Sequence, residues 1–273
     1  SEGHDPRDDI DFLEDELDMW YLGILEKGIE RFESKYHGAD ASIEADLAEQ
    51  MSAFRTNEDE IKRTILAEGL DLDPSTWDGT DRESLAREIR KRTKPMVIAA
   101  NKIDDPAAAE NFADVAADPA YDHLPIVPTS AHAEKALRTA DEAGRVDYTP
   151  GDDDFALVDD VSEEQAAGLE RIRSLLADHG GTGVQSSLEA ALFDALDLIA
   201  VFPGSDDGST SEEGSFRDCF LLPEGSTAED FANRIHTDLG DGLLHGIDCR
   251  SSRQIGSGHV LDDRDVIELV TTT

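Results

Sequence analysis

Two short polar segments follow two apolar runs, and their residue types suit the recognition of a guanine base. They are Asn101-Lys102-Ile103-Asp104, after the run 95–100, and Thr129-Ser130-Ala131, after the run 125–128. The carboxylate of Asp104 can accept both the N1 and the exocyclic N2 protons of guanine, a bidentate match that adenine does not offer. Because two motifs coincide in the same context, together they predict a guanine-binding site.

The other groups of these segments suit the rest of the base. Asn101 can address the opposite edge of guanine, the stem of Lys102 can lie on the ring plane, and a backbone N–H near Ala131 can reach O6. The predicted nucleotide-binding residues are Asn101, Lys102, Asp104, Ser130 and Ala131. The alternative interpretation is that Asn101 and Asp104 are ordinary turn residues ahead of a helix capped by Asp105.

The elements around the two segments follow a parallel α/β order. The runs 95–100 and 125–128 are predicted strands, the first of them buried on both faces. A helix between them starts with Asp105 as its cap and Pro106 at its first position. Strand, helix and strand within about 35 residues form a βαβ unit, and ligands of such sheets bind beyond the carboxyl ends of the strands. A capping box at Ser162 and Gln165 then opens a helix over 162–179.

Apolar periodicity predicts further helices ahead of this unit. One spans residues 10–36, and a second begins at Asp40 or Ser42 and continues through Ile65, so that the two form an antiparallel hairpin. A third starts at a capping box of Thr80 and Glu83. Its end is the one basic window of the chain, which is either a helix-end cation cluster or an RNA contact. The window comprises Arg87, Arg90, Lys91, Arg92 and Lys94.

The C-terminal residues predict a small α+β roll. A helix at about 185–197 leads to a strand at 198–202, and a flexible loop of Gly, Ser and acidic residues covers 203–215. Strands at 219–222, 243–249 and 265–270 and a helix at 227–239 follow. A ββαββ order of this size is most simply a β-grasp fold.

The charge of the chain indicates its environment more than its activity. Its 63 acidic residues outnumber 24 basic ones, for a net charge of −39, and they run through every segment. A chain this acidic should bind neither nucleic acid nor an anionic membrane surface through its bulk charge. The even distribution of the acidic residues and the scarcity of Lys favour a protein from a high-salt cytoplasm. The alternative is that the protein mimics nucleic acid and binds a basic partner. Two Cys form no disulfide framework, which also favours the cytoplasm.

Several motifs together resemble the Obg-like (YchF-type) translation-associated GTPases, and the Asp at position 104 resembles their archaeal GTP-type subgroup. The motifs are Gly-His-Asp-Pro-x-x-Asp-Ile at 3–10, the segment 94–104, Pro-Thr-Ser-Ala at 128–131, Gly-Gly-Thr-Gly-Val-Gln at 180–185, and three stretches at 221–231, 235–240 and 260–267 that resemble a TGS domain. The resemblance implies an α/β fold: a partial P-loop NTPase G domain over 1–11 and 91–195, an inserted α-helical hairpin over 12–90, and a C-terminal β-grasp (TGS) domain over 196–273.

The resemblance also implies activity and partners. The intact protein would bind and hydrolyse GTP with Mg²⁺ as a cytoplasmic, ribosome-associated factor, without a membrane. No G-x-x-x-x-G-K-[ST] phosphate loop occurs in this sequence, so we expect no hydrolysis by this chain, and an open sheet edge that favours a homodimer. The alternative is a non-enzymatic adaptor in which the hairpin and the TGS domain bind RNA or protein. The candidate RNA-binding residues are Arg234, His236, Arg250 and Arg253.

The high-salt interpretation predicts salt-dependent stability. A net charge of −39 repels itself across a Debye length that falls from about 8 Å at physiological ionic strength to about 3 Å in molar salt. We expect the melting temperature to rise steadily between these conditions. Calorimetry in increasing potassium chloride measures this, and a constant melting temperature would contradict the interpretation.

Overall fold

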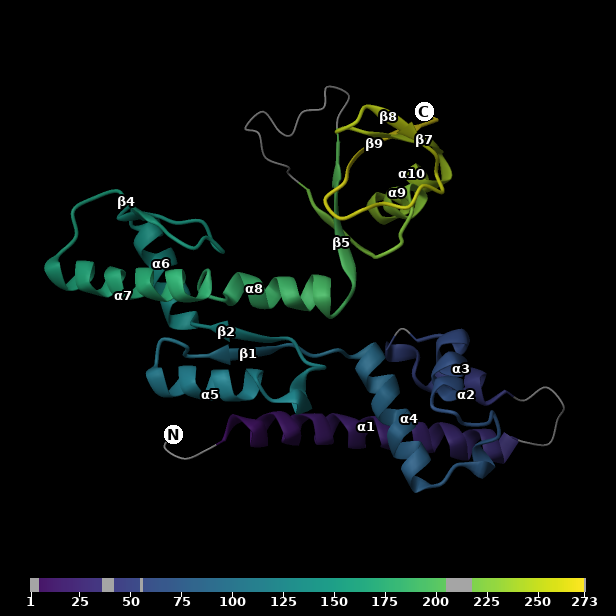
Figure 1. Ribbon diagram of the computed structural model, residues 1–273. Coiled ribbons are helices and arrows are strands. Elements are labelled where there is room, and N and C mark those ends of the chain that lie inside the picture. Colours follow the sequence, from purple (N-terminus) through teal and green to yellow (C-terminus); the bar gives the residue numbers. More distant parts are fainter. Residues whose placement is uncertain (1–4, 36–41, 55, 205–217, 273) are drawn as a thin grey trace. The chain divides into compact units, whose positions relative to one another are not determined.

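The chain forms two compact units, Ser1–Gly183 and Val184–Thr273, in the computed structural model (Figure 1). The structure describes residues 5–35, 42–54, 56–204 and 218–272. Three sequence features lie outside them: the first two residues of the motif at 3–10, the helix start considered at Asp40, and residues 205–215 of the expected loop. Among the described residues, no helix is both long and apolar enough to cross a lipid bilayer.

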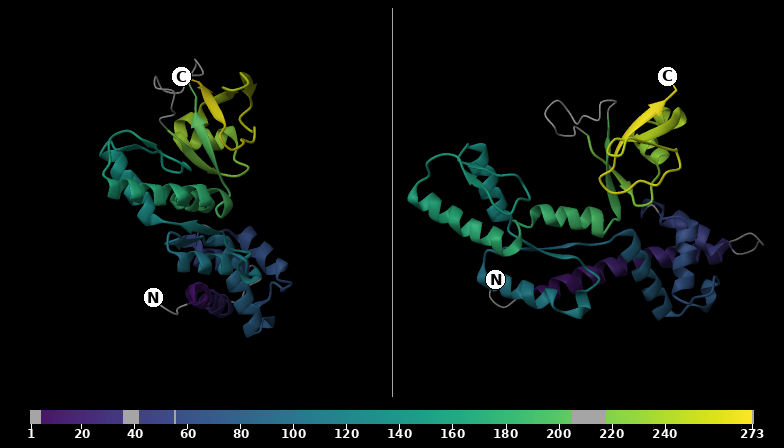
Figure 2. Two further views of the ribbon diagram at one scale, coloured as in Figure 1. Left: turned by 60° about the vertical axis from the view of Figure 1, so that its left-hand side comes forward. Right: turned by 45° about the horizontal axis from the view of Figure 1, so that its top comes forward.

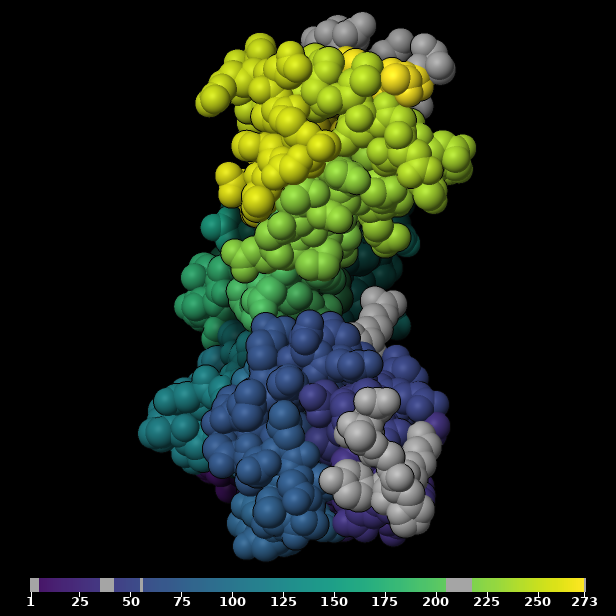
Figure 3. Space-filling model, turned by 90° about the vertical axis from the view of Figure 1, so that its right-hand side faces the viewer, coloured from purple at the N-terminus to yellow at the C-terminus, as the bar shows by residue number. Residues whose placement is uncertain are grey.

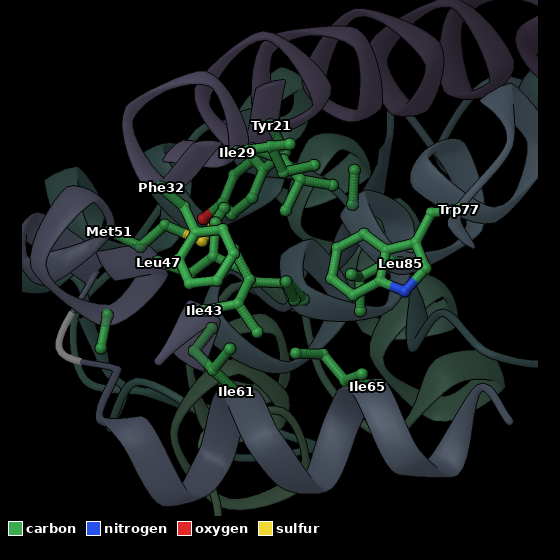
Figure 4. Packing of buried hydrophobic residues seen from close by; sticks show 14 residues of the cluster. Tyr21, Ile29, Phe32, Ile43, Leu47, Met51, Ile61, Ile65, Trp77 and Leu85 are labelled. Carbon is green, nitrogen blue, oxygen red and sulfur yellow. The ribbon is translucent and has the colours of Figure 1, made fainter. Parts of the chain in front are cut away.

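The first unit opens with a helical subdomain, which consists of α1 (Pro6–Lys35), α2 (Ile43–Gln50), α3 (Glu58–Ala67) and α4 (Gly79–Thr93). Its apolar side chains point into one cluster, in which Tyr21, Leu47 and Ile65 have no exposed surface (Figure 4). Burial of each such side chain contributes roughly 1.5–3 kcal/mol. In the space-filling view, the purple and blue residues of the subdomain gather in one part of the surface (Figure 3). The subdomain therefore has its own hydrophobic core within the unit.

The second helix, which the sequence predicted as one element through Ile65, is two helices. A 3₁₀ turn at Ser52–Phe54 ends the α2 segment, and α3 begins anew after Asn57. The Asn57 side chain accepts from the Glu60 N–H at 3.0 Å, and the Glu60 carboxylate accepts from the Asn57 N–H at 3.1 Å. This reciprocal cap satisfies two backbone donors and starts a new helix where apolar periodicity alone predicted continuity.

The start of α4 also differs from the prediction. Its cap is Asp78, paired with Asp81, rather than Thr80 paired with Glu83. The Asp78 carboxylate accepts from the Asp81 N–H at 3.0 Å, and Asp81 accepts from the Asp78 N–H at 2.9 Å. Two carboxylates thus serve as the two halves of the box, next to the positive end of the helix dipole.

The basic window at the end of α4 is partly internal. The Arg90 side chain is only 2% exposed and lies between two carboxylates of α1, with Nη2 2.8 Å from Glu14 and Nε 2.8 Å from Asp18. Arg87 pairs with the same Asp18, and Lys91 pairs with Glu88 of its own helix. These ion pairs join α4 to α1, so Arg90 and Arg87 have a structural role in the described chain.

The βαβ unit that the sequence predicted is present. It consists of β1 (Ile98–Asn101), α5 (Pro106–Ala116) and β2 (Ile126–Thr129), and α5 has the predicted Asp105 cap and Pro106 start. The strands are parallel, and Asn101 lies opposite Thr129. One face of the pair, with Ile98 and Ile126, packs on α5 and α1, which lie side by side in Figures 1 and 2.

The expectation that β1 is buried on both faces is wrong. Its residues alternate between half-buried and exposed. Within the described residues, β1 pairs only with β2, so the sheet has two strands and its second face lacks a full layer. A continuous apolar run predicts burial only where a complete sheet supplies cover on both sides.

The rest of the first unit follows β2 in the chain. It contains α6 (Ala131–Glu142), the short antiparallel strands β3 (Val146–Asp147) and β4 (Ala156–Leu157), and α7 (Glu163–His179). The predicted capping box of α7 is present at Ser162 and Gln165, and Gly180 ends the helix at a φ of 72°. The sequence did not predict α6, which begins directly after β2.

The second unit is a five-stranded sheet packed on helices. Its elements are α8 (Val184–Glu189), a π-helical turn (Ala190–Asp194), β5 (Leu198–Pro203), β6 (Phe220–Pro223), α9 (Ala228–Ile235), α10 (Thr237–Asp241), β7 (Leu243–Asp248), β8 (Arg253–Ile255) and β9 (Val266–Thr271). The strand order is β6-β5-β9-β7-β8, and β5 and β9 are parallel. Phe231 of α9 has no exposed surface and centres the core.

Three details of this unit correct the sequence prediction. The helix expected at 185–197 ends as an α-helix at Glu189. The helix expected over 227–239 is interrupted at His236, whose φ of −162° is extended. Strand β8 was not predicted, because its three residues carry only one apolar side chain, Ile255. The β-grasp order itself is present.

The buried position of Arg90 predicts a large loss of stability on its removal. In Arg90→Met, Glu14 and Asp18 keep their charges without the cation between them, and we expect a loss of about 3–5 kcal/mol. Arg87→Met is the matched control, because its side chain is 51% exposed and should cost under about 1 kcal/mol. Urea unfolding followed by fluorescence measures both, since Trp20 and Trp77 lie in the first unit. Equal losses in the two variants would contradict this role.

Candidate functional site

The parallel register of β1 and β2 brings the two polar segments together. Because Asn101 and Thr129 lie opposite each other, the residues that follow them leave the sheet at the same edge. The Ile103 N–H donates to the carbonyl of Thr129 at 3.2 Å and extends the pairing beyond the strands. The structure thus places all five residues of the predicted base site at one strand end, as expected for parallel sheets.

Asn101 links the two segments through its side chain. Its Oδ1 accepts from the Lys102 N–H at 2.8 Å and from the Ala131 N–H at 3.2 Å. A backbone N–H near Ala131 was predicted to reach guanine O6, and the N–H of Ala131 itself donates to Asn101 in this structure. The amide nitrogen of Asn101 is a donor at an exposed position.

Ser130 holds the carboxylate of Asp104. Its hydroxyl donates to Asp104 Oδ1 at 2.7 Å and accepts from the Ala133 N–H at 3.1 Å, so it also caps α6. Ser130 is fully buried, whereas Asp104 is exposed. A buried hydroxyl with both functions in use has one orientation, and it fixes one oxygen of a carboxylate whose remaining lone pairs face solvent.

Lys102 occupies a strained backbone position. Its φ of 71° lies in the left-handed region, and its carbonyl accepts from the Asp105 N–H at 2.8 Å in a tight turn. Such a conformation costs a non-glycine residue about 1–2 kcal/mol. The turn gives the two neighbouring aspartates different partners. Asp105 caps α5, whereas Asp104 accepts the hydrogen bond from Ser130.

A buried carboxylate that the sequence analysis missed lies behind this edge. Glu134 of α6 is 6% exposed and accepts hydrogen bonds from Thr182 Oγ1 at 2.6 Å, Tyr148 Oη at 2.9 Å and Arg138 Nε at 2.5 Å. Burial acts to raise its pKa, but the three hydrogen bonds outweigh burial, and the pKa lies below its usual value. Glu134 is therefore held as an ionised acceptor.

The glycine-rich stretch 180–183 packs against the strand end. The carbonyl of Thr182 accepts from the Ser130 N–H at 2.8 Å. Gly183 has a φ of 77°, and a Cβ added there would lie 1.8 Å from the carbonyl oxygen of Pro128. Only glycine permits this approach, so the stretch is a connector that contacts the β2–α6 junction.

A groove of about 1160 Å³ opens between α5, α6 and α7, next to Asp104. Its walls combine aliphatic residues with basic ones, among them Lys135, Arg145 and Arg171. Asn101, Lys102 and Ala131 are not among its lining residues, so the predicted base site is an exposed surface beside the groove.

The four candidate RNA-binding residues lie on two segments of the second unit. Arg234 and His236 are at the end of α9, and the His236 ring accepts from the Asp238 N–H at 3.2 Å. Arg250 and Arg253 are in and after the β7–β8 turn, where Arg250 Nη2 donates to the carbonyl of Arg264 at 2.7 Å. All four residues are exposed, and His236 and Arg250 also make these local contacts.

The close packing at Gly183 predicts a severe effect of a single methyl group. Gly183→Ala combines left-handed strain with a displacement of the Pro128 backbone, and we expect a loss above about 3 kcal/mol. Gly180→Ala is the matched control, because its φ of 72° is similar but nothing lies within 4 Å of an added Cβ. It should cost about 1–2 kcal/mol. Urea unfolding followed by tryptophan fluorescence compares them, and a Gly183 variant no weaker than the Gly180 variant would refute the packing.

Two family models match the chain. The model described as "Obg-like GTPase YGR210-like, G4 motif-containing domain" matches residues 99–206, and the TGS domain model matches residues 206–271. The first range contains both polar segments of the candidate site. The second contains β6 through β9.

Relatives and solved structures agree with these matches. A protein from Methanocaldococcus jannaschii, described as an uncharacterized GTP-binding protein, is 34% identical over 99% of this chain and 68% of its own length. Another so described, from Schizosaccharomyces pombe, is 29% identical over 83% of this chain and 58% of its own length. The crystal structure of a GTP binding protein from Pyrococcus horikoshii OT3 matches all of this chain and 73% of its own, with a TM-score of 0.80 and 34% identity.

A more distant structure shares the fold alone. The YchF GTPase of Schizosaccharomyces pombe has a TM-score of 0.51 and 16% identity over 98% of this chain and 67% of its own. These findings confirm the family and the fold class expected from the sequence. The chain spans 68% and 58% of the two curated relatives, and 34% identity extends over nearly its whole length. This chain therefore belongs to the Obg-like (YchF-type) family of GTP-binding proteins.

Proposed function

We propose that the strand-end surface formed by Asn101, Lys102, Asp104, Ser130 and Ala131 binds the guanine base of GTP. The observation that carries this proposal is the 2.7 Å hydrogen bond from Ser130 Oγ to Asp104 Oδ1. It holds one oxygen of an exposed carboxylate, and a carboxylate restrained in this way can accept the N1 and N2 protons of guanine together. Adenine presents an acceptor at N1 and has no amino group at position 2, so the same carboxylate disfavours it.

The neighbouring groups complete the proposed site. The Asn101 amide can donate to the opposite edge of the base, while its oxygen holds Ala131. The stem of Lys102, raised by the left-handed turn, can cover the ring plane. The Ala131 N–H can share its hydrogen between Asn101 and guanine O6. In the proposed site, the base thus makes hydrogen bonds at both edges and packs against Lys102 on one face.

Hydrolysis belongs to the proposed activity of the intact protein. The 273 residues contain no phosphate loop, and phosphoryl transfer depends on the charges that such a loop and Mg²⁺ supply. Among the described residues, no group of three or more His, Cys, Asp or Glu side chains is placed to hold a metal ion. For this chain we propose base recognition without catalysis.

The proposed cellular role is that of a cytoplasmic, ribosome-associated factor. We propose a partial G domain over 1–11 and 91–195, a helical insert over 12–90 and a TGS domain over 196–273, in which exposed Arg234 and Arg253 are the available RNA contacts. The TGS part holds sixteen acids and five Arg, so any RNA contact is local. Among the described strands, β1 is hydrogen-bonded to β2 alone, and this supports the proposal of a homodimer.

The proposal predicts that Asp104→Asn abolishes guanine preference. Hydrogen bonds to a charged acceptor contribute about 1.5–3 kcal/mol each, so the wild-type chain should prefer GMP to AMP at least about tenfold. Ligand-observed NMR titration into the millimolar range, in molar potassium chloride, measures both affinities. Asp105→Asn is the matched control, because Asn caps helices as well as Asp does and the preference should persist. A wild-type chain that binds the two nucleotides equally would rule the proposal out.

A further inference from the structure

Glu134 and Thr182 are buried polar residues that the proposed base contacts do not use. Thr182 is 1% exposed and Glu134 is 6% exposed, and they meet through the 2.6 Å hydrogen bond from Thr182 Oγ1 to Glu134 Oε2. In a buried setting such a bond is strong, because water cannot replace either partner. The pair therefore fixes the position of the stretch 180–183 relative to α6.

Thr182 uses its backbone to hold Ser130. Its carbonyl accepts from the Ser130 N–H at 2.8 Å, while its hydroxyl is engaged by Glu134. Ser130 in turn donates its own hydroxyl to Asp104. A continuous series of hydrogen bonds thus runs from a buried carboxylate, through one threonine and one serine, to the exposed carboxylate of the proposed base site.

A second set of contacts keeps this series in place. The Glu134 carboxylate receives three donors, and two of them, Thr182 Oγ1 and Tyr148 Oη, share its Oε2 oxygen. Behind Thr182, the approach of Gly183 to Pro128 leaves no room for the stretch to move toward β2. Ser130 is therefore held from the strand side and from the helix side.

We propose that Thr182 and Glu134 are positioning residues that determine guanine specificity by holding the Ser130 hydroxyl against Asp104. This inference rests on the proposed function of the strand end. The Asp104 carboxylate must lie in the plane of the base to accept both the N1 and the N2 protons. When Ser130 shifts, the carboxylate rotates, and the bond to the exocyclic amino group weakens.

The comparison of GMP with IMP isolates this effect. IMP lacks only the exocyclic amino group, so the ratio of the two affinities reports the N2 contact alone. For the wild-type chain, one hydrogen bond to a charged acceptor predicts a ratio of about tenfold or more. Ligand-observed NMR titration of the full chain with each nucleotide, in molar potassium chloride, gives the ratio.

Three variants test the proposal. Thr182→Val removes the hydroxyl and preserves the shape, and we expect the ratio to fall below about threefold. Thr182→Ser retains the hydroxyl and should restore the wild-type ratio. Thr64→Val is the matched control, because it makes the same exchange at a buried threonine of α3 in the helical subdomain, outside this series of hydrogen bonds, and it should keep the ratio. Thr182→Cys, a much weaker donor of similar shape, replaces the valine variant if that variant does not fold.

The outcomes separate this inference from the proposed function. If the wild-type chain does not distinguish GMP from AMP, the proposed function fails. If it does, and the Thr182→Val chain melts at a lower temperature but keeps the wild-type GMP to IMP ratio, then Thr182 has only a structural role and the inference is overturned. An equal fall of the ratio in Thr64→Val would also overturn it, because the effect would then come from lost stability and not from the position of Ser130.

Discussion

The parallel pairing of β1 with β2 is the constraint on which the candidate site depends. It places Asn101 opposite Thr129, and the two chains then leave the sheet side by side. A shift of one residue in this register would turn Ser130 away from Asp104. Two strands alone form a weak sheet. The register is therefore supported by the packing of Ile98 and Ile126 on α5 and α1, and by the pairing of Ser130 with Thr182.

Buried charge supports the first unit at two points, in different ways. Arg90 forms ion pairs with two carboxylates of α1 and so attaches α4 to that helix. Glu134 is held by neutral hydroxyls as well as by Arg138, which lies at the surface. A chain with a net charge of −39 places most of its acids in solvent. Each of these carboxylates is paired with a cation or accepts several hydrogen bonds, which offsets the cost of its burial.

Local signals in the sequence predicted some elements well. Asp105 with Pro106 correctly marked the start of α5, and Ser162 with Gln165 marked α7, because a helix cap is a contact within a few residues. Apolar periodicity did not predict the end of one helix and the start of the next at Asn57, because the apolar spacing continues across this boundary. It also missed α6, whose inward positions include Glu134, a residue that periodicity counts as exposed.

The sequence by itself determined the residue types at the strand ends, the family, and the βαβ and β-grasp orders, because motifs and caps depend on residues close together in the chain. Only the tertiary structure decided which groups these residues meet. Ser130 and Asp104 are 26 positions apart, and Thr182 and Glu134 are 48 apart. Contacts at such separations depend on strand register and on the packing of α6. The pattern of residue types along the chain does not predict such contacts. The burial of Arg90 against α1 was not predicted for the same reason, because its partners lie more than 70 positions away.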